Sequence, residues 1–155
     1  MYNGTPQWSL DALFISPFTA KRKFDEDGVP HWKKLSPVTA PTGIIVMDHF
    51  LRRLTAGQGK VDEFCLIYGL RVEDLDSLIY ILTGMPGYKF RLAYQLRLAD
   101  ELLRYTELSL HDVAKRSGLG THSNLCVVLG KYLGLTPTGR RIMLRRPGDA
   151  GRYRL

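Results

Sequence analysis

The sequence lacks the features of membrane and secreted proteins. None of its 155 residues belongs to an apolar run near the roughly 18 residues of a membrane span. The first five residues show no basic region followed by an apolar core, so we expect no signal peptide. Two cysteines, Cys65 and Cys126, are too few and too far apart for a disulfide framework. We expect both to be small buried apolar residues in a protein of the reducing cytoplasm.

The sequence also lacks the usual signs of catalysis. The histidines show no metal-ligand spacing with one another or with the cysteines; they are His31, His49, His111 and His122. No glycine-rich phosphate loop and no nucleophile elbow is present. We therefore expect no metal, no cofactor and no enzymatic activity.

The charge is unevenly distributed along the chain. The formal net charge is +7, and residues 110–146 hold seven basic residues against one acidic residue. Residues 61–84 show the reverse, with one basic and five acidic residues. A basic segment attracts phosphate groups and an acidic one repels them. The two segments are therefore predicted to differ in what they bind.

Residues 1–43 show little periodicity, and prolines interrupt every possible helix, at Pro6, Pro17, Pro30, Pro37 and Pro41. We expect a partly irregular N-terminal extension. Its large apolar residues favour a short amphipathic patch that docks on the rest of the chain; they are Trp8, Leu10, Leu13, Phe14 and Phe18. The basic run at 21–23 has two interpretations, a solvated loop or an arm that contacts phosphate.

The rest of the chain reads as helices, with no convincing strand. A unit of two short helices around a glycine turn occurs twice, about fifty residues apart, so that Gly69-Leu70 returns as Gly118-Leu119. These repeats predict helix–turn–helix units over 61–84 and 110–133. Between them, a stripe predicts a long linker helix over 87–105, formed by Tyr88, Leu92, Leu96, Ala99 and Leu103.

Helix start signals complete the predicted fold. Ser109 and Thr121 are expected N-caps, and Pro137 opens a last helix rich in arginine. With a first helix from about residue 44, the prediction is all-α: a seven-helix bundle over 44–146, with two helix–turn–helix units joined by the linker helix. Residues 147–155 are expected to form a basic tail.

One stretch, residues 95–137, carries an ordered set of motif elements. It runs from Gln95-Leu96 through an apolar-apolar-alanine helix ending at Ala114 and a glycine-aliphatic turn at Gly118, and closes with Gly134-Leu-Thr-Pro137. In this order and spacing, it resembles the DNA-binding domain of AraC/XylS-type bacterial transcription regulators. The resemblance extends more weakly back to residue 44, and it implies two helix–turn–helix units bridged by a long helix. No small-molecule sensor domain is visible.

The resemblance implies a set of DNA-contacting residues, which in this sequence are Arg71, Ser77, Thr121, His122, Ser123, Asn124, Val127, Lys131, Arg140 and Arg141. Asn124 is suited to adenine and Val127 to a thymine methyl group, although Val127 stands where arginine is common. Lys131, Arg140 and Arg141 are suited to phosphate. Alternatively, 122–124 are ordinary exposed helix residues, and the arginines form a solvated face favoured by the helix dipole.

The first unit departs from the resemblance. Its second helix places Glu73, Asp74 and Asp76 where a phosphate backbone is expected. Two hypotheses follow. In the first, the chain is a transcription regulator that binds duplex DNA in a sequence-specific way, mainly through the second unit. In the second, it is a degenerate form of this fold whose acidic first unit binds a protein, either RNA polymerase or another regulator.

Overall fold

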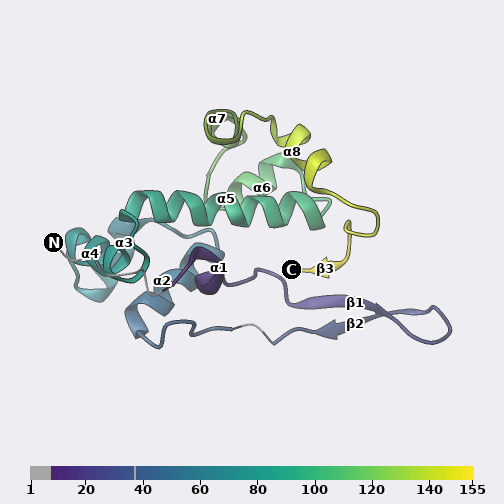
Figure 1. Cartoon of the computed structure of the whole chain (residues 1–155), viewed down its shortest axis with the longest axis horizontal. Coiled ribbons are helices and arrows are strands. Elements are labelled where there is room, and N and C mark those ends of the chain that lie inside the picture. The colour runs from purple at the N-terminus through teal and green to yellow at the C-terminus, as the bar shows by residue number, and fades with distance from the viewer. Residues whose placement is uncertain (1–7, 37) are drawn as a thin grey trace.

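The structure, a computed structural model, describes residues 8–36 and 38–155. Its helices are α1 (Leu10–Leu13), α2 (Ile45–Thr55), α3 (Val61–Tyr68), α4 (Val72–Thr83), α5 (Gly87–Tyr105), α6 (Leu110–Arg116), α7 (His122–Leu133) and α8 (Pro137–Leu144). The seven from α2 to α8 match the predicted helices, and α5 bridges the two helix–turn–helix units (Figure 1). Pro6 and Pro37 lie outside the described residues.

Local sequence signals begin and end these helices where they were expected to. The Ser109 hydroxyl accepts a hydrogen bond from the Asp112 amide, and the Thr121 hydroxyl accepts one from the Asn124 amide. Gly69 and Gly118 adopt positive φ values of 65° and 84° at the two turns, a conformation that side chains disfavour. Short-range chemistry therefore determines these helix boundaries.

Two hydrophobic cores lie along α5. One is built under α2, α3 and α4 around Phe50, Phe64 and Ile79, and the other under α6 and α7 around Val113 and Leu125. The linker helix contributes to both through residues spaced by four, namely Phe90, Tyr94, Leu98 and Leu102. This row lies on another side of α5 from the start of the predicted stripe, so Tyr88 is exposed, whereas Ala99 and Leu103 of the stripe are buried. A helix packed on more than one side has no single apolar face.

The N-terminal segment docks on the rest of the chain, as predicted, and it contributes to both cores. Leu13 and Ile15 are buried in the first core, and Phe18 is buried in the second. The Ile15 amide donates to the Tyr94 hydroxyl at 3.0 Å, and Thr55 is 2.6 Å from the same oxygen. The chain thus crosses from one core to the other between residues 13 and 18.

The prediction that the chain has no strand is wrong. Strands β1 (Ala20–Phe24), β2 (Pro30–Lys34) and β3 (Tyr153–Arg154) form an antiparallel sheet in the order β2-β1-β3. The hairpin of β1 and β2 extends from the helical body (Figure 1). Five of the ten residues of β1 and β2 are lysine or arginine, so the apolar alternation that marks a strand is absent. Residues 153–154, predicted as part of a basic tail, form the third strand.

Some predicted burial is also wrong. Cys65 is buried but Cys126 is exposed, and both are free. In the sequence, Leu125, Leu129, Tyr132 and Leu133 predict one buried side of the helix from 122 to 133. Leu125 and Leu129 are buried, but Tyr132 and Leu133 are 51% and 38% exposed because they lie past the end of the second core. Within residues 8–36 and 38–155, no helix is long and apolar enough to cross a membrane.

Asp149 fixes the C-terminal segment to α5. Its side chain is 1% exposed and accepts from Arg104 Nε at 2.8 Å and from the Arg146 amide at 2.9 Å. Burial raises the pKa of Asp149, whereas these hydrogen bonds and the nearby arginines lower it. The lowering effects together are larger, so the pKa of Asp149 lies below its usual value.

We expect Asp149→Asn to lower the free energy of unfolding by about 2 kcal/mol at neutral pH, because the arginines lose a charged acceptor. A lowered pKa contributes stability above the unfolded-state pKa of about 3.9, and this contribution is lost as pH falls through the folded pKa. The difference between wild type and variant should therefore shrink below about pH 4. Urea unfolding across pH measures it, with exposed Asp27→Asn as the control; an equal loss for both variants would contradict the assignment.

Candidate nucleic-acid interface

The turn of the second helix–turn–helix is held by side chains of its own unit and of α5. The Asn124 side-chain amide donates to the Leu119 carbonyl at 2.7 Å, across the turn. Gln95 of α5 donates to the Gly118 carbonyl at 3.4 Å. A Cβ atom at Gly118 would lie 3.1 Å from the Gln95 amide nitrogen, which leaves little room for a larger residue. The start of α7 is thus fixed relative to α5.

The outer face of α7 carries one helical stripe of exposed residues. Ser123, Val127 and Lys131 follow one another at a spacing of four, and Val127 is 64% exposed. Thr121 and His122 are exposed at the N-terminal end of the helix. No acidic residue occurs in α7. The structure therefore brings together five of the predicted contact residues on one accessible face.

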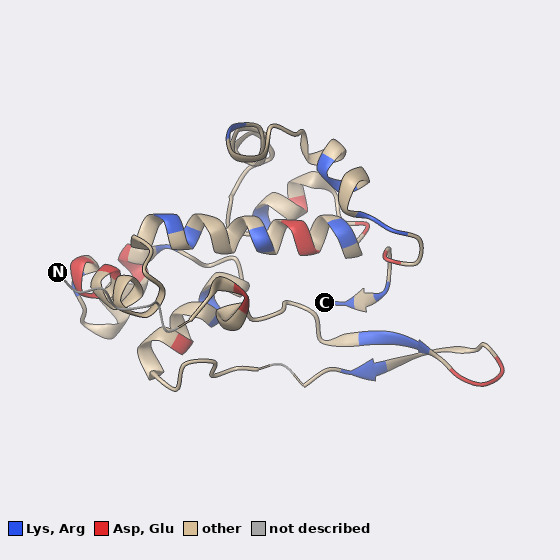
Figure 2. Cartoon of the chain, in the orientation of Figure 1, with Lys and Arg blue, Asp and Glu red and all other residues tan. Residues whose placement is uncertain are grey.

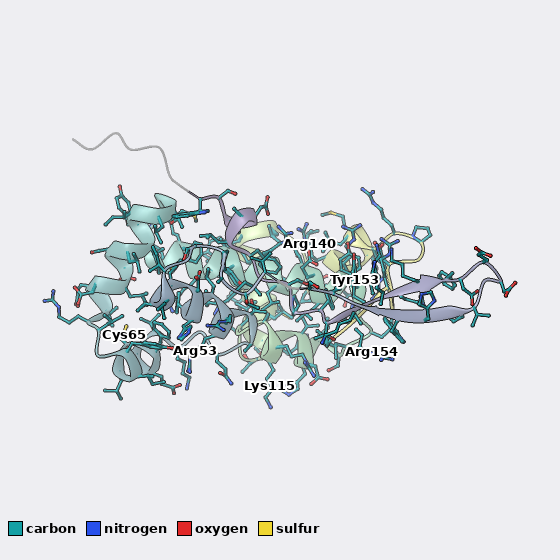
Figure 3. The ribbon with its side chains drawn as sticks, turned by 90° about the horizontal axis from the view of Figure 1, so that it is seen from below. Arg53, Cys65, Lys115, Arg140, Tyr153 and Arg154 are labelled. Atoms are coloured by element: carbon teal, nitrogen blue, oxygen red, sulfur yellow. The ribbon has the colours of Figure 1, made fainter. Side chains whose placement is uncertain are left out.

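Asn124 has a different position from this stripe. Because its amide nitrogen donates to Leu119, the bidentate geometry that would read adenine requires this turn contact to break. Lys115 and Arg116, which the sequence did not single out, are exposed at the end of α6. Lys115 lies at the outer edge of the molecule in Figure 3. A lysine in the last turn of a helix is typical of ordinary solvated helices, so the sequence offered no specific signal for it.

Arg140 and Arg141, predicted as phosphate contacts, both have hydrogen-bond partners within the protein. Arg140 binds Asp100 of α5 through two hydrogen bonds, of 2.9 and 2.6 Å, and this contact raises the pKa of Arg140. Arg141 Nε donates to the Leu103 carbonyl at 3.1 Å, and its Nη2 donates to the Leu108 carbonyl at 2.7 Å. Burial and the neighbouring Arg145 lower the pKa of Arg141. Both guanidinium groups are engaged inside the protein.

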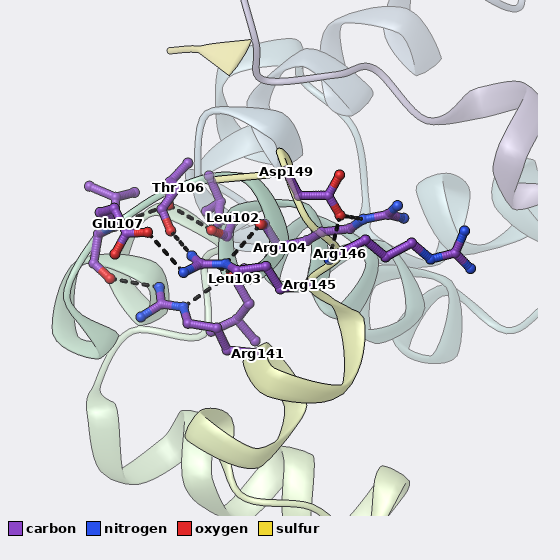
Figure 4. Close-up of polar contacts among 10 residues, drawn as sticks. Leu102, Leu103, Arg104, Thr106, Glu107, Arg141, Arg145, Arg146 and Asp149 are labelled. Atoms are coloured by element: carbon purple, nitrogen blue, oxygen red, sulfur yellow. Dashed lines mark hydrogen bonds and ion pairs between the residues drawn. The ribbon is translucent and has the colours of Figure 1, made fainter. Parts of the chain in front are cut away.

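Arg145 joins Arg141 at the C-terminal end of α5 (Figure 4). Arg145 donates to the Arg104 and Thr106 carbonyls at 3.2 and 2.6 Å. The last carbonyls of a helix lack partners within it, and the helix dipole makes this end favourable for cations. Arg146 points away from this group in Figure 4. Arg140 and Arg141 of α8, and Arg145 directly after it, therefore hold α8 on α5.

The first helix–turn–helix has a different surface. Arg71 pairs with Asp74 at 3.1 Å, and this contact raises the pKa of Arg71 and lowers that of Asp74. Ser77 is exposed directly after the acidic residues of α4, and Figure 2 shows the acidic colour gathered at this end of the molecule. Large apolar side chains are also exposed on α3 and α4, namely Leu66, Ile67, Tyr80 and Ile81.

A close backbone contact links the two units. A Cβ atom at Gly57, which has a φ of 74°, would lie 2.7 Å from the Arg116 carbonyl oxygen. The loop after α2 therefore packs directly against the end of α6. Together with α5, this contact sets the orientation of α7 relative to α4.

Comparisons with known proteins identify the fold. No family model matches the sequence, and no curated protein matches it. The C-terminal domain of the response regulator AraT from Geobacillus stearothermophilus superposes with a TM-score of 0.58 at 18% identity, over 67% of this chain and 86% of that one. An AraC-type DNA-binding domain regulator from Chromobacterium violaceum gives 0.53 at 17% identity, over 68% of this chain and 97% of that one.

The C-terminal domain of the response regulator yesN from Fusobacterium nucleatum subsp. nucleatum ATCC 25586 also superposes. Its TM-score is 0.54 at 21% identity, over 63% of this chain and 94% of that one. The all-α prediction with two helix–turn–helix units is thereby confirmed as a fold.

We expect Arg141→Met to lower the free energy of unfolding by about 2 kcal/mol, because two carbonyl groups lose their donors. Arg146→Met removes the same charge from an exposed position and should change it by less than about 0.5 kcal/mol. Urea denaturation measures both. If the two variants are equally stable, the hydrogen bonds of Arg141 to the two carbonyls do not stabilise the fold. Arg141 would then again be a predicted phosphate contact.

Proposed function

We propose that this chain, which has the fold of AraC-type DNA-binding domains, is a transcription regulator that binds duplex DNA sequence-specifically through α7. The observation that carries the proposal is the exposed stripe of Ser123, Val127 and Lys131, free of acidic residues, on the recognition helix of the basic unit. An α-helix fits the major groove of DNA, where base edges are distinguishable. The proposal includes no catalytic role.

The roles of the residues follow from their positions. Ser123 and His122, near the start of α7, are placed to hydrogen-bond base edges, and Val127 is placed to contact a thymine methyl group. Lys131, one helical step further, and Lys115, at the end of α6, are placed to contact phosphates on either side of the groove. Arg140 and Arg141 are left out of this set because their guanidinium groups are engaged with α5.

Fluorescence-anisotropy titration with a random duplex pool at several salt concentrations tests the proposal. We expect wild-type affinity to fall steeply with salt, and Lys131→Gln to reduce the slope of log K against log salt by about 0.9, because one phosphate contact is lost. Selection from the pool should show that Val127→Ala relaxes preference at one thymine.

Lys60→Gln is the matched control, because Lys60 is exposed and paired with Glu63 at the acidic end of the molecule. Its salt slope should equal that of the wild type. The absence of wild-type binding at low salt would overturn the proposal, and equal effects of the two lysine variants would overturn the role of α7.

A second candidate function is supported by the first unit. Exposed Leu66 and Ile67 follow the carboxylates at the start of α3, and exposed Tyr80 and Ile81 follow those of α4. Large exposed apolar side chains of this kind are typical of protein-binding sites. The acidic residues favour a basic partner, so this face is proposed to bind RNA polymerase or another regulator.

We expect Ile81→Lys to weaken binding to purified RNA polymerase at least about tenfold, because an exposed anchor is lost and a like charge meets a basic surface. Thr138→Lys, an exposed change on α8, is the control. Biolayer interferometry measures the affinity. If wild-type protein binds neither RNA polymerase nor another regulator, this second function is excluded. The duplex titration tests the first function independently.

A further inference from the structure

The sheet gathers cations on one face at the base of the hairpin. The antiparallel register places Lys34 and Arg154 on either side of Ala20. Neighbouring strands are roughly 5 Å apart, so the Cα atoms of Lys34 and Arg154 are separated by about 10 Å, with only the small alanine between them. Arg22, two residues along β1, lies on the same face. We call Arg22, Lys34 and Arg154 the sheet cation face.

These cations have no carboxylate partners within residues 8–36 and 38–155, where none of the ion pairs involves a basic residue of β1 or β2, or Arg154. On the other face, Lys21 lies directly opposite Lys33. Like charges paired across strands destabilise a sheet, and β2 is exposed along its whole length, so little apolar burial offsets this repulsion. Arg22, Lys34 and Arg154, on the first face, are therefore open to an anionic ligand.

Aromatic rings hold two of these guanidinium groups in place. The Arg154 guanidinium lies 4.3 Å from the ring centre of Trp32, which is 40% exposed, and the Arg22 guanidinium lies 5.5 Å from that of Phe24. Figure 3 shows Tyr153 and Arg154 where β3 meets the base of the hairpin. Stacking limits the conformations of each guanidinium before any ligand arrives, while its N–H groups stay available.

The tip of the hairpin restricts how an anion can approach. Asp25 accepts from the Asp27 and Val29 amides at 2.9 and 2.7 Å and so closes the turn, next to exposed Glu26. Figure 2 shows this acidic tip beyond the basic strands. Because the tip repels phosphate, the hairpin is not suited to full insertion into a groove, and contact is confined to its base.

The sheet also lies away from α7. In Figure 1, α7 is on one side of α5 and the β1–β2 hairpin is on the other. The exposed stripe of α7 faces away from the core that it shares with α5, because Leu125 and Leu129 on its opposite side are buried there. A straight duplex held by α7 therefore does not reach the sheet cation face.

We propose that the sheet cation face is a second DNA-binding surface, which holds the phosphate backbone of a separate duplex segment without reading its sequence. Three cations spread across three strands match a phosphate row better than a single small anion, and guanidinium and ammonium groups are typical phosphate ligands. The protein then bridges two duplexes. Of these two duplexes, only the binding of the first rests on the proposed function of α7.

A sandwich assay tests this inference. Full-length protein is bound to a bead-immobilised duplex, excess protein is washed away, and a fluorescent second duplex is added at low salt. Wild-type protein should capture the second duplex. Arg22→Gln/Lys34→Gln/Arg154→Gln should capture it at least about tenfold less, because three phosphate contacts are lost, with binding to the bead duplex unchanged. Lys21→Gln/Lys23→Gln/Lys33→Gln, which removes equal charge from the opposite face, should retain most capture.

Three outcomes would overturn the inference: wild type on the bead duplex captures no second duplex, the first triple variant captures as well as wild type, or both triple variants lose capture equally. A Ser123→Glu/Lys131→Glu variant separates the two proposals, because it disables α7 alone. This variant should still bind duplex DNA in a salt-dependent way, and adding Arg22→Gln/Lys34→Gln/Arg154→Gln should abolish that binding. This result supports the sheet surface even if wild-type α7 reads no DNA. No residual binding refutes it.

Discussion

The contact on which much of this structure depends joins Arg141 of α8 and Arg145, the residue after α8, to the C-terminal end of α5. The last carbonyls of α5 have no partners within the helix, and Arg141 and Arg145 donate to them while their charges complement the helix dipole. This contact places α8, and the chain after α8 then returns to α5 through Asp149 and Arg104. From there it reaches β3 and completes the sheet. One capped helix end therefore connects the second helix–turn–helix to the N-terminal segment.

The distribution of charge gives the molecule three distinct surfaces. The first helix–turn–helix combines carboxylates with exposed apolar side chains, the outer face of α7 is free of acidic residues, and the sheet is basic with two stacked guanidinium groups. Electrostatics favours a basic protein at the first surface and phosphate at the other two. Arg140, Arg141 and Arg145 belong to none of these surfaces, although they are three of the seven basic residues of 110–146.

Residue chemistry over short distances accounts for what could be predicted. Hydroxyl caps at Ser109 and Thr121, glycine turns and helical stripes act within a few residues, so helix positions and the repeated unit could be read from the sequence. The exposed stripe of α7 also follows, because Leu125 and Leu129 define the buried side. By contrast, Thr19 meets Arg154 only through pairing across most of the chain, and no local pattern encodes that pairing.

By itself, the sequence determined the seven helices, the two helix–turn–helix units and the opposite charges of those units, because each depends on neighbouring residues. Only the tertiary structure decided which arginines are free. Arg140 and Arg141 look the same as surface cations in sequence, but they are consumed by Asp100 and by the carbonyls at the end of α5. The basic run at 21–23, open to two interpretations, became part of a sheet once distant residues 153–154 paired with it. The charge of a side chain depends on that residue alone, whereas the group that it pairs with depends on the fold of the whole chain.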